Sequence, residues 1–224
     1  MLYIVPTPVG NLEDASARCL RVLREVKAVY CEDTRRTLKL LSHHGIHTPV
    51  LRYRDRDPRG VDAVLERLRR GEDLALASDS GTPVISDPGL DLVCRAREEG
   101  IPVCSIPGPC AAVAALAGSG LPGGSFAFLG FLPRSRSRQA KDLSAAASLG
   151  MSLVVYESPF RVLDLLDVAG EVLGPDARAA VCRELSKVHE EWLTGTISSV
   201  RKTLQARKEL LGEFVLVFHP VDKP

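Results

Sequence analysis

Short apolar runs alternate with amphipathic stretches along the first half of the chain. Apolar runs bounded by Gly, Pro or Asp are typical of buried strands, and apolar residues at helical spacing are typical of the helices that connect parallel strands. Strands are predicted at 2–6, 28–31, 50–53, 74–78 and 103–106, with helices around 19–26, 34–43, 61–68, 90–99 and 109–117. This alternation predicts an α/β fold in which the first domain, residues 1–117, holds a mostly parallel sheet.

The segment GSGLPGG at 118–124 is the strongest interruption of regular structure. Gly and Pro disfavour both helix and strand, so this segment is predicted to be a linker between two domains. Beyond it, strands are predicted at 126–132, 153–156, 179–183, 192–197 and 214–218, and helices at 139–147, 160–172 and 199–208. The last three strands are separated by fewer helices than in the first half. Residues 125–224 are therefore expected to form a second α/β domain with a mixed sheet.

The composition is that of an ordinary globular protein, since 45% of the 224 residues are hydrophobic and 25% are charged. The formal net charge of +1 means that nucleic-acid binding would have to come from local basic patches. The six cysteines form no CxxC pair and none stands near a His at zinc-ligand spacing, so we expect reduced thiols and no metal site. The first predicted strand begins at Leu2, which leaves no room for a signal peptide, and no long apolar run follows. We therefore expect a cytoplasmic protein with no membrane attachment.

The segment SDSGTPVISDPG at 78–89 follows a predicted buried strand and is rich in Asp, Ser, Gly and Pro. In open α/β sheets, ligands bind beyond the carboxyl ends of the strands, where such loops expose backbone polar groups. Asp79 is thus placed to accept hydrogen bonds from ribose hydroxyls or from an ammonium group. The alternative is structural: an Asx turn at Asp79 and an N-cap at Asp87, the role we favour for Asp87.

Three other predicted strands end in similar segments. They are TPVGN at 7–11, which ends in Asn11, GPCA at 108–111 and YESPFR at 156–161. TPVGN has neither the GxxxxGK[ST] nor the GxGxxG pattern, which excludes an NTPase or dinucleotide site there. Because YESPFR lies in the second predicted domain, these segments together predict an active-site cleft between the domains.

These segments resemble, in order along the chain, those of a known family. LYIVPTPVGN, CEDTR (31–35), SDSGTPVISDPG, IPGPCA (106–111), SGLP (119–122), GFLPR (130–134), YESPFR and RELSK (183–187) are similar to the ribosomal RNA small-subunit methyltransferase I family of the tetrapyrrole methylase superfamily. The resemblance implies a two-domain α/β enzyme that binds S-adenosylmethionine in the cleft. It also implies methylation of the ribose 2′-hydroxyl of a cytidine in 16S rRNA, the small ribosomal subunit as partner, and a homodimer.

By the same resemblance, eight residues are expected to contact the cofactor, several through backbone atoms. They are Asp79, Gly81, Thr82, Pro83, Cys110, Ala111, Tyr156 and Leu185. The chain departs from the family pattern at Ser78 and Ser80, where Gly and Ala are usual, and at Cys110, which replaces the Ser of GPSA. These side chains are small, so the loop geometry is expected to be kept. Many members have a further C-terminal segment that this chain lacks, which bears on the RNA target more than on the cofactor.

Methyl transfer from a sulfonium requires a collinear arrangement and assistance for a weakly nucleophilic hydroxyl. Lys187 of RELSK is the predicted catalytic residue. As a cation it would stabilise a developing alkoxide, and with a lowered pKa it would act as the base. The alternative is a surface lysine paired with Glu190 or Glu191.

Several polar residues near predicted strand ends are expected to bind the substrate. They are Asn11, Glu32, Arg35, Arg161 and Arg183. Arginine suits phosphate because its planar group of donors engages two oxygens. For Arg35 the alternative is an ion pair with Glu32 or Asp33 that stabilises the turn, with Thr34 as the N-cap of the next helix.

The segment RSRSRQAK at 134–141 is the strongest candidate for RNA contact, since Arg134, Arg136 and Arg138 lie in it without any acidic residue. The alternative is a solvated, mobile loop. A second group of arginines, Arg52, Arg54, Arg56 and Arg59, is diluted by Asp55 and Asp57.

Two other functions stay open. One is methylation of a tetrapyrrole or another small molecule by the same fold, and CEDTR, YESPFR and the arginine segment favour rRNA over it. The other is a non-catalytic ribosome-assembly factor, for which Ser78, Ser80 and Cys110 are the only hints. The cofactor-loop residues that are kept favour an enzyme.

Overall fold

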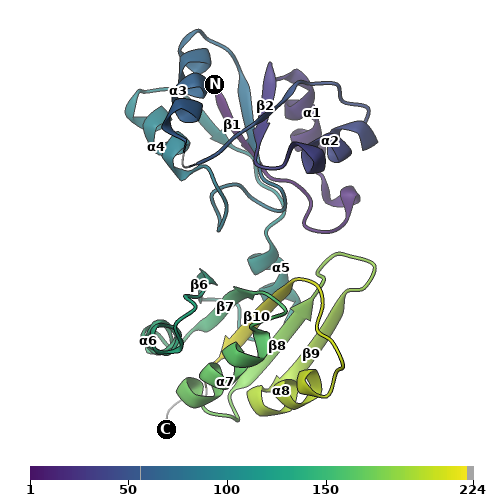
Figure 1. Ribbon diagram of the computed structural model, residues 1–224, viewed down its shortest axis with the longest axis vertical. Helices are drawn as coiled ribbons and strands as arrows, with labels where there is room; N and C mark the ends of the chain where they lie inside the picture. The colour runs from purple at the N-terminus through teal and green to yellow at the C-terminus, as the bar shows by residue number, and fades with distance from the viewer. Residues whose placement is uncertain (56, 221–224) are drawn as a thin grey trace. The chain divides into compact units, whose positions relative to one another are not determined.

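The computed structural model describes residues 1–55 and 57–220, so Arg56 and the last four residues of the predicted second domain lie outside the described residues. The chain folds into two compact units, Met1–Cys110 and Ala111–Pro224 (Figure 1). The predicted linker at 118–124 therefore lies within the second unit, and the boundary predicted there is displaced. The cause is α5 (Ala111–Gly118), which packs against β7 and β10 of the second unit.

The N-terminal unit is built on a five-stranded sheet in the order β3-β2-β4-β1-β5. The strands are β1 (Leu2–Val5), β2 (Ala28–Cys31), β3 (Val50–Arg52), β4 (Leu74–Ala77) and β5 (Val103–Ser105). Every pairing is parallel, and Leu2, for example, pairs with Leu74 on one side and Val103 on the other. The predicted parallel sheet is confirmed. Its carboxyl ends, where ligands bind in such folds, lie along one edge.

Helices cover both faces of this sheet, with α1 (Ala17–Glu25) and α2 (Thr34–His43) on one face and α3 (Pro58–Arg69) and α4 (Leu90–Glu98) on the other (Figure 1). Successive strand side chains point to opposite faces. Ile4 thus packs with the core under α3 and α4, while its neighbour Val5 packs with the core under α1 and α2. Burial on both faces explains why these strands read as continuous apolar runs.

The C-terminal unit holds a second five-stranded sheet in the order β6-β7-β10-β8-β9. The strands are β6 (Phe126–Phe131), β7 (Ser152–Glu157), β8 (Arg178–Arg183), β9 (Glu191–Thr196) and β10 (Phe214–His219). β6 and β7 are parallel, whereas β10 runs antiparallel to β7 and β8, and β9 runs antiparallel to β8. The predicted mixed sheet is confirmed.

Three helices of this unit, α6 (Arg136–Ala147), α7 (Val162–Leu173) and α8 (Ile197–Gln205), share one apolar core with the sheet. The predicted start of α6 at 139 was late, because the helix already includes Arg136 and Arg138. The end of α5 lies close to β9: a Cβ at Gly118 would stand 2.7 Å from Cζ2 of Trp192. This close approach requires glycine and ties α5 to the C-terminal unit.

Among the described residues, no helix combines the length and the apolar character needed to cross a membrane.

Candidate active site

The loops that follow β1 and β4 are joined at the carboxyl edge of the N-terminal sheet. The Thr7 N–H donates to Gly81 O at 2.8 Å, and the Gly81 N–H donates to Thr7 O at 3.0 Å. The buried Ser78 hydroxyl also donates to Gly81 O at 2.6 Å, and the Thr7 hydroxyl donates to Ser78 O at 3.0 Å. The segment predicted from its composition is therefore an ordered loop held from two strands.

Gly81 occupies a backbone conformation that favours glycine, with φ +82°. A Cβ there would lie 3.4 Å from Cγ1 of Val9, at van der Waals distance, so the loop lies next to the segment that follows β1. The adjacent Thr82 hydroxyl donates to Pro109 O at 2.8 Å, which links the β4 loop to the GPCA segment after β5. Three of the four predicted strand-end segments thus meet within this unit.

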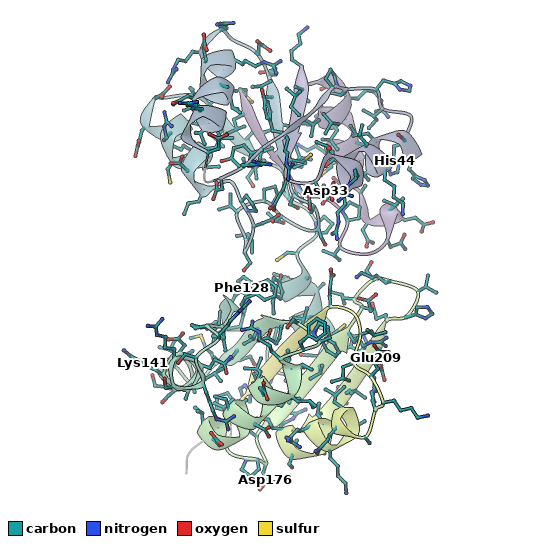
Figure 2. All side chains as sticks on the ribbon, viewed as in Figure 1. Asp33, His44, Phe128, Lys141, Asp176 and Glu209 are labelled. Atoms are coloured by element: carbon teal, nitrogen blue, oxygen red, sulfur yellow. The ribbon has the colours of Figure 1, made fainter. Side chains whose placement is uncertain are left out.

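The Asp79 side chain connects the β4 loop to the CEDTR segment after β2. Its Oδ1 accepts a hydrogen bond of 2.9 Å from the Asp33 main-chain N–H. Figure 2 labels Asp33 at the lower edge of the N-terminal unit as drawn. The N-cap of α2 is Asp33, which accepts from the Arg35 N–H, so the prediction that Thr34 caps this helix was wrong. The Asp33 carboxylate accepts a hydrogen bond from a main-chain N–H in the first turn of α2, which is the role of an N-cap side chain.

Arg35 forms the structural ion pair that was one of its two predicted roles. Its Nε and Nη2 donate to the Asp33 carboxylate at 2.9 and 2.6 Å. Hydrogen bonds from Arg35 lower the Asp33 pKa to about 2. The Arg35 side chain is 88% exposed, so it meets solvent while holding Asp33. Its proposed contact with substrate phosphate stays a prediction.

Asp87 is the residue whose role the sequence analysis missed. The N-cap of α4 is Gly89, with no side-chain cap, so the prediction that Asp87 caps this helix was wrong. A positive φ of 129° at Gly89, and a Cβ that would stand 2.5 Å from Leu76 Cδ2, leave that position to glycine. Asp87 instead turns toward Ser78, Asp79 and Glu32, and its buried Oδ2 has no hydrogen-bond partner within the described residues.

Burial, and next the negative charges of Asp79 and Glu32, raise the Asp87 pKa to about 6. Three carboxyl groups thus face one small cavity at the carboxyl edge, which Tyr53 also lines. Within the described ranges, no group of His, Cys, Asp or Glu has the geometry to hold a metal ion. The sequence did contain a sign of this role, because Asp87 is a second Asp in the segment SDSGTPVISDPG. It was assigned to a helix cap instead.

Of the predicted residues not yet placed, Asn11 has a structural partner. Asn11 is the N-cap of a short 3-10 helix, Leu12–Asp14, and its side chain accepts from the Glu13 N–H at 3.1 Å. Glu32 is exposed beside the cavity. Cys110 is a free, partly buried thiol at the end of this unit, and Ala111 is the first residue of α5.

In the C-terminal unit, Tyr156 holds the start of α5. Its hydroxyl accepts from the Ala112 N–H at 2.9 Å, and its ring contacts Phe128 and Phe131 edge-on, with centroids 4.9 and 5.6 Å away. The next residue, Glu157, is buried, and its Oε1 accepts from Arg161 Nε at 2.9 Å. Within the described residues its Oε2 has no partner. Arg161 therefore compensates a buried carboxylate.

Lys187 pairs with Glu184 at 2.9 Å and with Glu213 at 3.0 Å, and not with Glu190 or Glu191, the partners named in the structural alternative. Burial alone would lower the Lys187 pKa, but the two carboxylates outweigh it and raise the pKa above its usual value. The condition for a base role, a lowered pKa, is therefore not met. A cationic role stays a prediction. The pairing arises because Glu184 and Ser186 adopt positive φ and turn RELSK back toward β10.

Leu185 is partly buried in this same turn. Arg183, at the end of β8, donates to Leu211 O at 2.7 Å and pairs with Glu191 at 3.4 Å. The structure thus assigns both residues a place in the RELSK turn, and their cofactor and substrate contacts stay predictions.

The arginine segment is helical from Arg136 onward rather than a mobile loop. Arg134, Arg136 and Arg161 line one cavity with Gln139 and Asp164, which brings together three of the predicted substrate residues. Arg138 is exposed and does not line it. Gln139 and Asp164 were not predicted, because neither residue type stood out in the sequence.

Comparison with known proteins gives the family. The model of the tetrapyrrole (corrin/porphyrin) methylases matches residues 1–201. A relative from Hydrogenobaculum sp. (strain Y04AAS1), named ribosomal RNA small subunit methyltransferase I, is 44% identical over 218 residues, which cover 96% of this chain and 94% of that protein. The chain belongs to the ribosomal RNA small subunit methyltransferase I family. The resemblance carried by its motifs is confirmed.

Solved structures of other tetrapyrrole methylases share the fold of this family member. The cobalt precorrin-4 methyltransferase of cobalamin biosynthesis matches with a TM-score of 0.73 and 15% identity, covering 96% of this chain and 93% of that one. The uroporphyrin-III C-methyltransferase from Thermus thermophilus, solved with S-adenosylhomocysteine, matches with a TM-score of 0.70 and 18% identity, covering 97% and 96%. At these identities the similarity shows the fold.

Proposed function

We propose that this methyltransferase transfers a methyl group from S-adenosylmethionine to the ribose 2′-hydroxyl of a cytidine in 16S rRNA. One observation carries the proposal, namely the 44% identity to a ribosomal RNA small subunit methyltransferase I over nearly the whole of both chains. The ordered loops at the carboxyl edge of the parallel sheet support it, because ligands of such sheets bind there. The family resemblance further supports a cytoplasmic enzyme and a homodimer.

The residues of the β4 loop fit the proposed cofactor. Asp79 engages one carboxylate oxygen with Asp33 in the described residues, which leaves acceptor capacity for ribose hydroxyls. Gly81 holds the loop in a positive-φ conformation that other residues adopt only with strain, which fixes the course of the loop beside Asp79. We infer that Asp79, Gly81, Thr82, Pro83, Cys110, Ala111, Tyr156 and Leu185 hold the cofactor.

S-adenosylmethionine, when bound, would supply an electrophilic methyl carbon: a bond from this carbon to the ribose oxygen would form as its bond to sulfur breaks, leaving S-adenosylhomocysteine, and the hydroxyl proton would pass to solvent water. The chain has to hold the ribose oxygen in line with that bond, and positioning of this kind contributes several kcal/mol. Lys187 remains charged beside Glu184 and Glu213, so its proposed part is to stabilise negative charge on the oxygen. Asn11, Glu32, Arg35, Arg161, Arg183, Arg134, Arg136 and Arg138 are the proposed substrate contacts.

The test is methyl transfer to purified small ribosomal subunits from a strain that lacks the modification. Labelled S-adenosylmethionine is supplied, and the labelled position is mapped by nuclease digestion and mass spectrometry. A single 2′-O-methylcytidine in 16S rRNA is the expected result. Label on a base, or on a tetrapyrrole but not on rRNA, would overturn the proposal. Cofactor binding by calorimetry without transfer to any of these would also count against it, and absence of cofactor binding would favour an assembly factor.

A further inference from the structure

A polar cavity of about 260 Å³ lies in the C-terminal unit beside the start of α6. Its lining residues are Arg134, Arg136, Gln139, Arg161 and Asp164. They come from the segments that follow β6 and β7, the parallel pair of this sheet, and from the first turns of α6 and α7. The cavity is several times larger than the roughly 30 Å³ that a water molecule takes in the liquid, so it has room for a group of several atoms.

Gln139 indicates that the cavity is built for a ligand. The residue is only 4% exposed, yet its side-chain amide has no hydrogen-bond partner in the part of the chain that the structure describes. Buried amides are almost always hydrogen-bonded, because an unpaired one loses its bonds to water without replacement. Since Gln139 lines the cavity, its amide is available to hydrogen-bond a group held there.

Donors outnumber acceptors around the cavity. Arg134 forms no ion pair within the described residues, and the N-terminal turn of α6 has neither a side-chain cap nor an acidic residue. A helix N-terminus of this kind presents free N–H groups and partial positive charge. Arg136 and Arg161 add donors, although each also pairs with a carboxylate, Glu171 and Glu157 respectively. Asp164 is the single carboxylate in the lining.

Two exposed aromatic residues lie on the same segments. The Phe160 side chain, next to Arg161, is 88% exposed, and Phe131, near Arg134, is 57% exposed. Bases of single-stranded nucleic acid stack on aromatic rings while basic groups contact the backbone. The cavity therefore combines hydrogen-bond donors suited to a phosphate with exposed aromatic rings nearby in the chain. This combination favours a nucleic-acid strand as the ligand over a free anion.

We propose that this cavity binds a backbone phosphate of the single-stranded RNA substrate, with Phe160 offering a stacking surface to a neighbouring base. The inference rests on the proposed function for the identity of the strand. It adds a binding subsite that involves Arg134, Gln139 and the start of α6, none of which takes part in the chemical step.

Charge changes of opposite sign test the proposal without relying on loss of function alone. Binding of a short labelled oligocytidylate is measured by fluorescence anisotropy over a range of salt concentrations. Arg134→Gln is expected to weaken binding roughly three- to tenfold and to reduce the slope of log K against log salt by about 0.7. Asp164→Asn is expected to tighten binding roughly twofold to fivefold, because a repulsive carboxylate is removed. Lys202→Gln, an exposed charge removal on α8, is the matched control and should change neither.

A third variant separates binding from folding. Gln139→Leu keeps the size of the side chain and removes its donors, so RNA binding should weaken roughly threefold while the melting temperature stays the same or rises. Unchanged RNA affinity in Arg134→Gln and Asp164→Asn would overturn the proposal. RNA binding that does not weaken when inorganic phosphate is added as a competitor would also overturn it.

Methyl transfer is measured separately on the same variants with small ribosomal subunits. Altered RNA binding in a protein that transfers no methyl group would leave the subsite standing and count against the proposed function. Normal methyl transfer, with no effect of the cavity variants on RNA binding or on KM, would support the proposed function and reject the subsite.

Discussion

The main-chain N–H of Asp33 donates a 2.9 Å hydrogen bond to the carboxylate of Asp79, across two segments that are 46 residues apart in the chain. The bond connects the loops after β2 and β4, which are neighbours in the sheet. It orients the Asp79 side chain at the carboxyl edge of the parallel sheet. Asp79 is therefore a structural residue as well as the central candidate for cofactor binding. A substitution that tests cofactor binding has to keep the hydrogen bond to Asp33.

Asp79→Asn makes that separation. The Asn oxygen still accepts from the Asp33 N–H, but the negative charge is lost. Hydrogen bonds to charged groups contribute about 1.5–3 kcal/mol, so S-adenosylmethionine affinity is expected to fall roughly tenfold to hundredfold, measured by calorimetry. Asp79→Ala loses the loop contact as well and should also lower the melting temperature. Wild-type cofactor affinity in Asp79→Asn would remove Asp79 from the site.

Gly81→Ala tests the loop conformation against a matched glycine. Gly81 and Gly71 have nearly the same φ, +82° and +84°, but a Cβ at Gly81 would contact Val9 whereas one at Gly71 has nothing within 4 Å. A non-glycine residue in this region costs about 1–2 kcal/mol. Both variants should therefore lose similar stability, while only Gly81→Ala lowers cofactor affinity. Equal cofactor affinity in the two variants would contradict the role of the loop.

Asp87→Asn should stabilise the protein in a pH-dependent way. Its folded-state pKa of about 6 lies above the ordinary value of 3.8, so the folded chain holds a proton that the unfolded chain releases between these pH values. Stability from this group is present below about pH 4 and is lost as the pH rises to about 6. After allowance for partial exposure, the loss is on the order of 1 kcal/mol. The variant should melt a few degrees higher than wild type at pH 7.5 and at the same temperature at pH 4.

The control for this pH effect is Asp176→Asn, which changes an exposed carboxylate (Figure 2). It should show no comparable dependence on pH. A constant difference between Asp87→Asn and wild type from pH 4 to pH 8 would mean that the Asp87 carboxyl does not carry the proton.

Arg161→Met should be among the most destabilising substitutions on the surface of the C-terminal unit. It would leave the Glu157 carboxylate, whose side chain is 0% exposed, without its partner. Breaking a buried ion pair from one side costs about 3–5 kcal/mol. Glu157→Gln should cost less, since Arg161 still reaches solvent, and the double variant Glu157→Gln with Arg161→Met should recover part of the loss. Chemical denaturation of the four proteins gives the coupling energy, and additive losses would show that the pair is not coupled.

Lys187→Ala is expected to keep S-adenosylmethionine affinity and to lower kcat for methyl transfer. The structure adds a condition: since Glu184 and Glu213 raise the Lys187 pKa, the residue acts only as a cation. Lys187→Arg, which keeps the charge, should therefore restore most of the activity, and the kcat profile should show no titration of a lysine in the neutral pH range. An unchanged kcat in Lys187→Ala would reject the catalytic assignment.

Much of the fold was predictable because each strand and helix carries its own periodic signal. The strands of the N-terminal unit end within one residue of their predicted ends, since burial on both faces makes each a continuous apolar run. The mixed second sheet followed from the scarcity of helices between its last strands. The domain boundary did not follow, because Gly118 marks a close packing contact with Trp192 rather than a linker.

For the candidate site, the sequence by itself determined the family, the α/β class and the loops at the strand ends, because these are local patterns of residue type and spacing. Only the tertiary structure decided which polar groups meet. Asp33 rather than Thr34 caps α2, Asp87 faces Asp79 and Glu32 instead of capping α4, and Lys187 pairs with Glu213, which lies 26 residues further along the chain. Partner choice and pKa depend on burial and on charges brought together from segments far apart in the chain, and no local pattern records them.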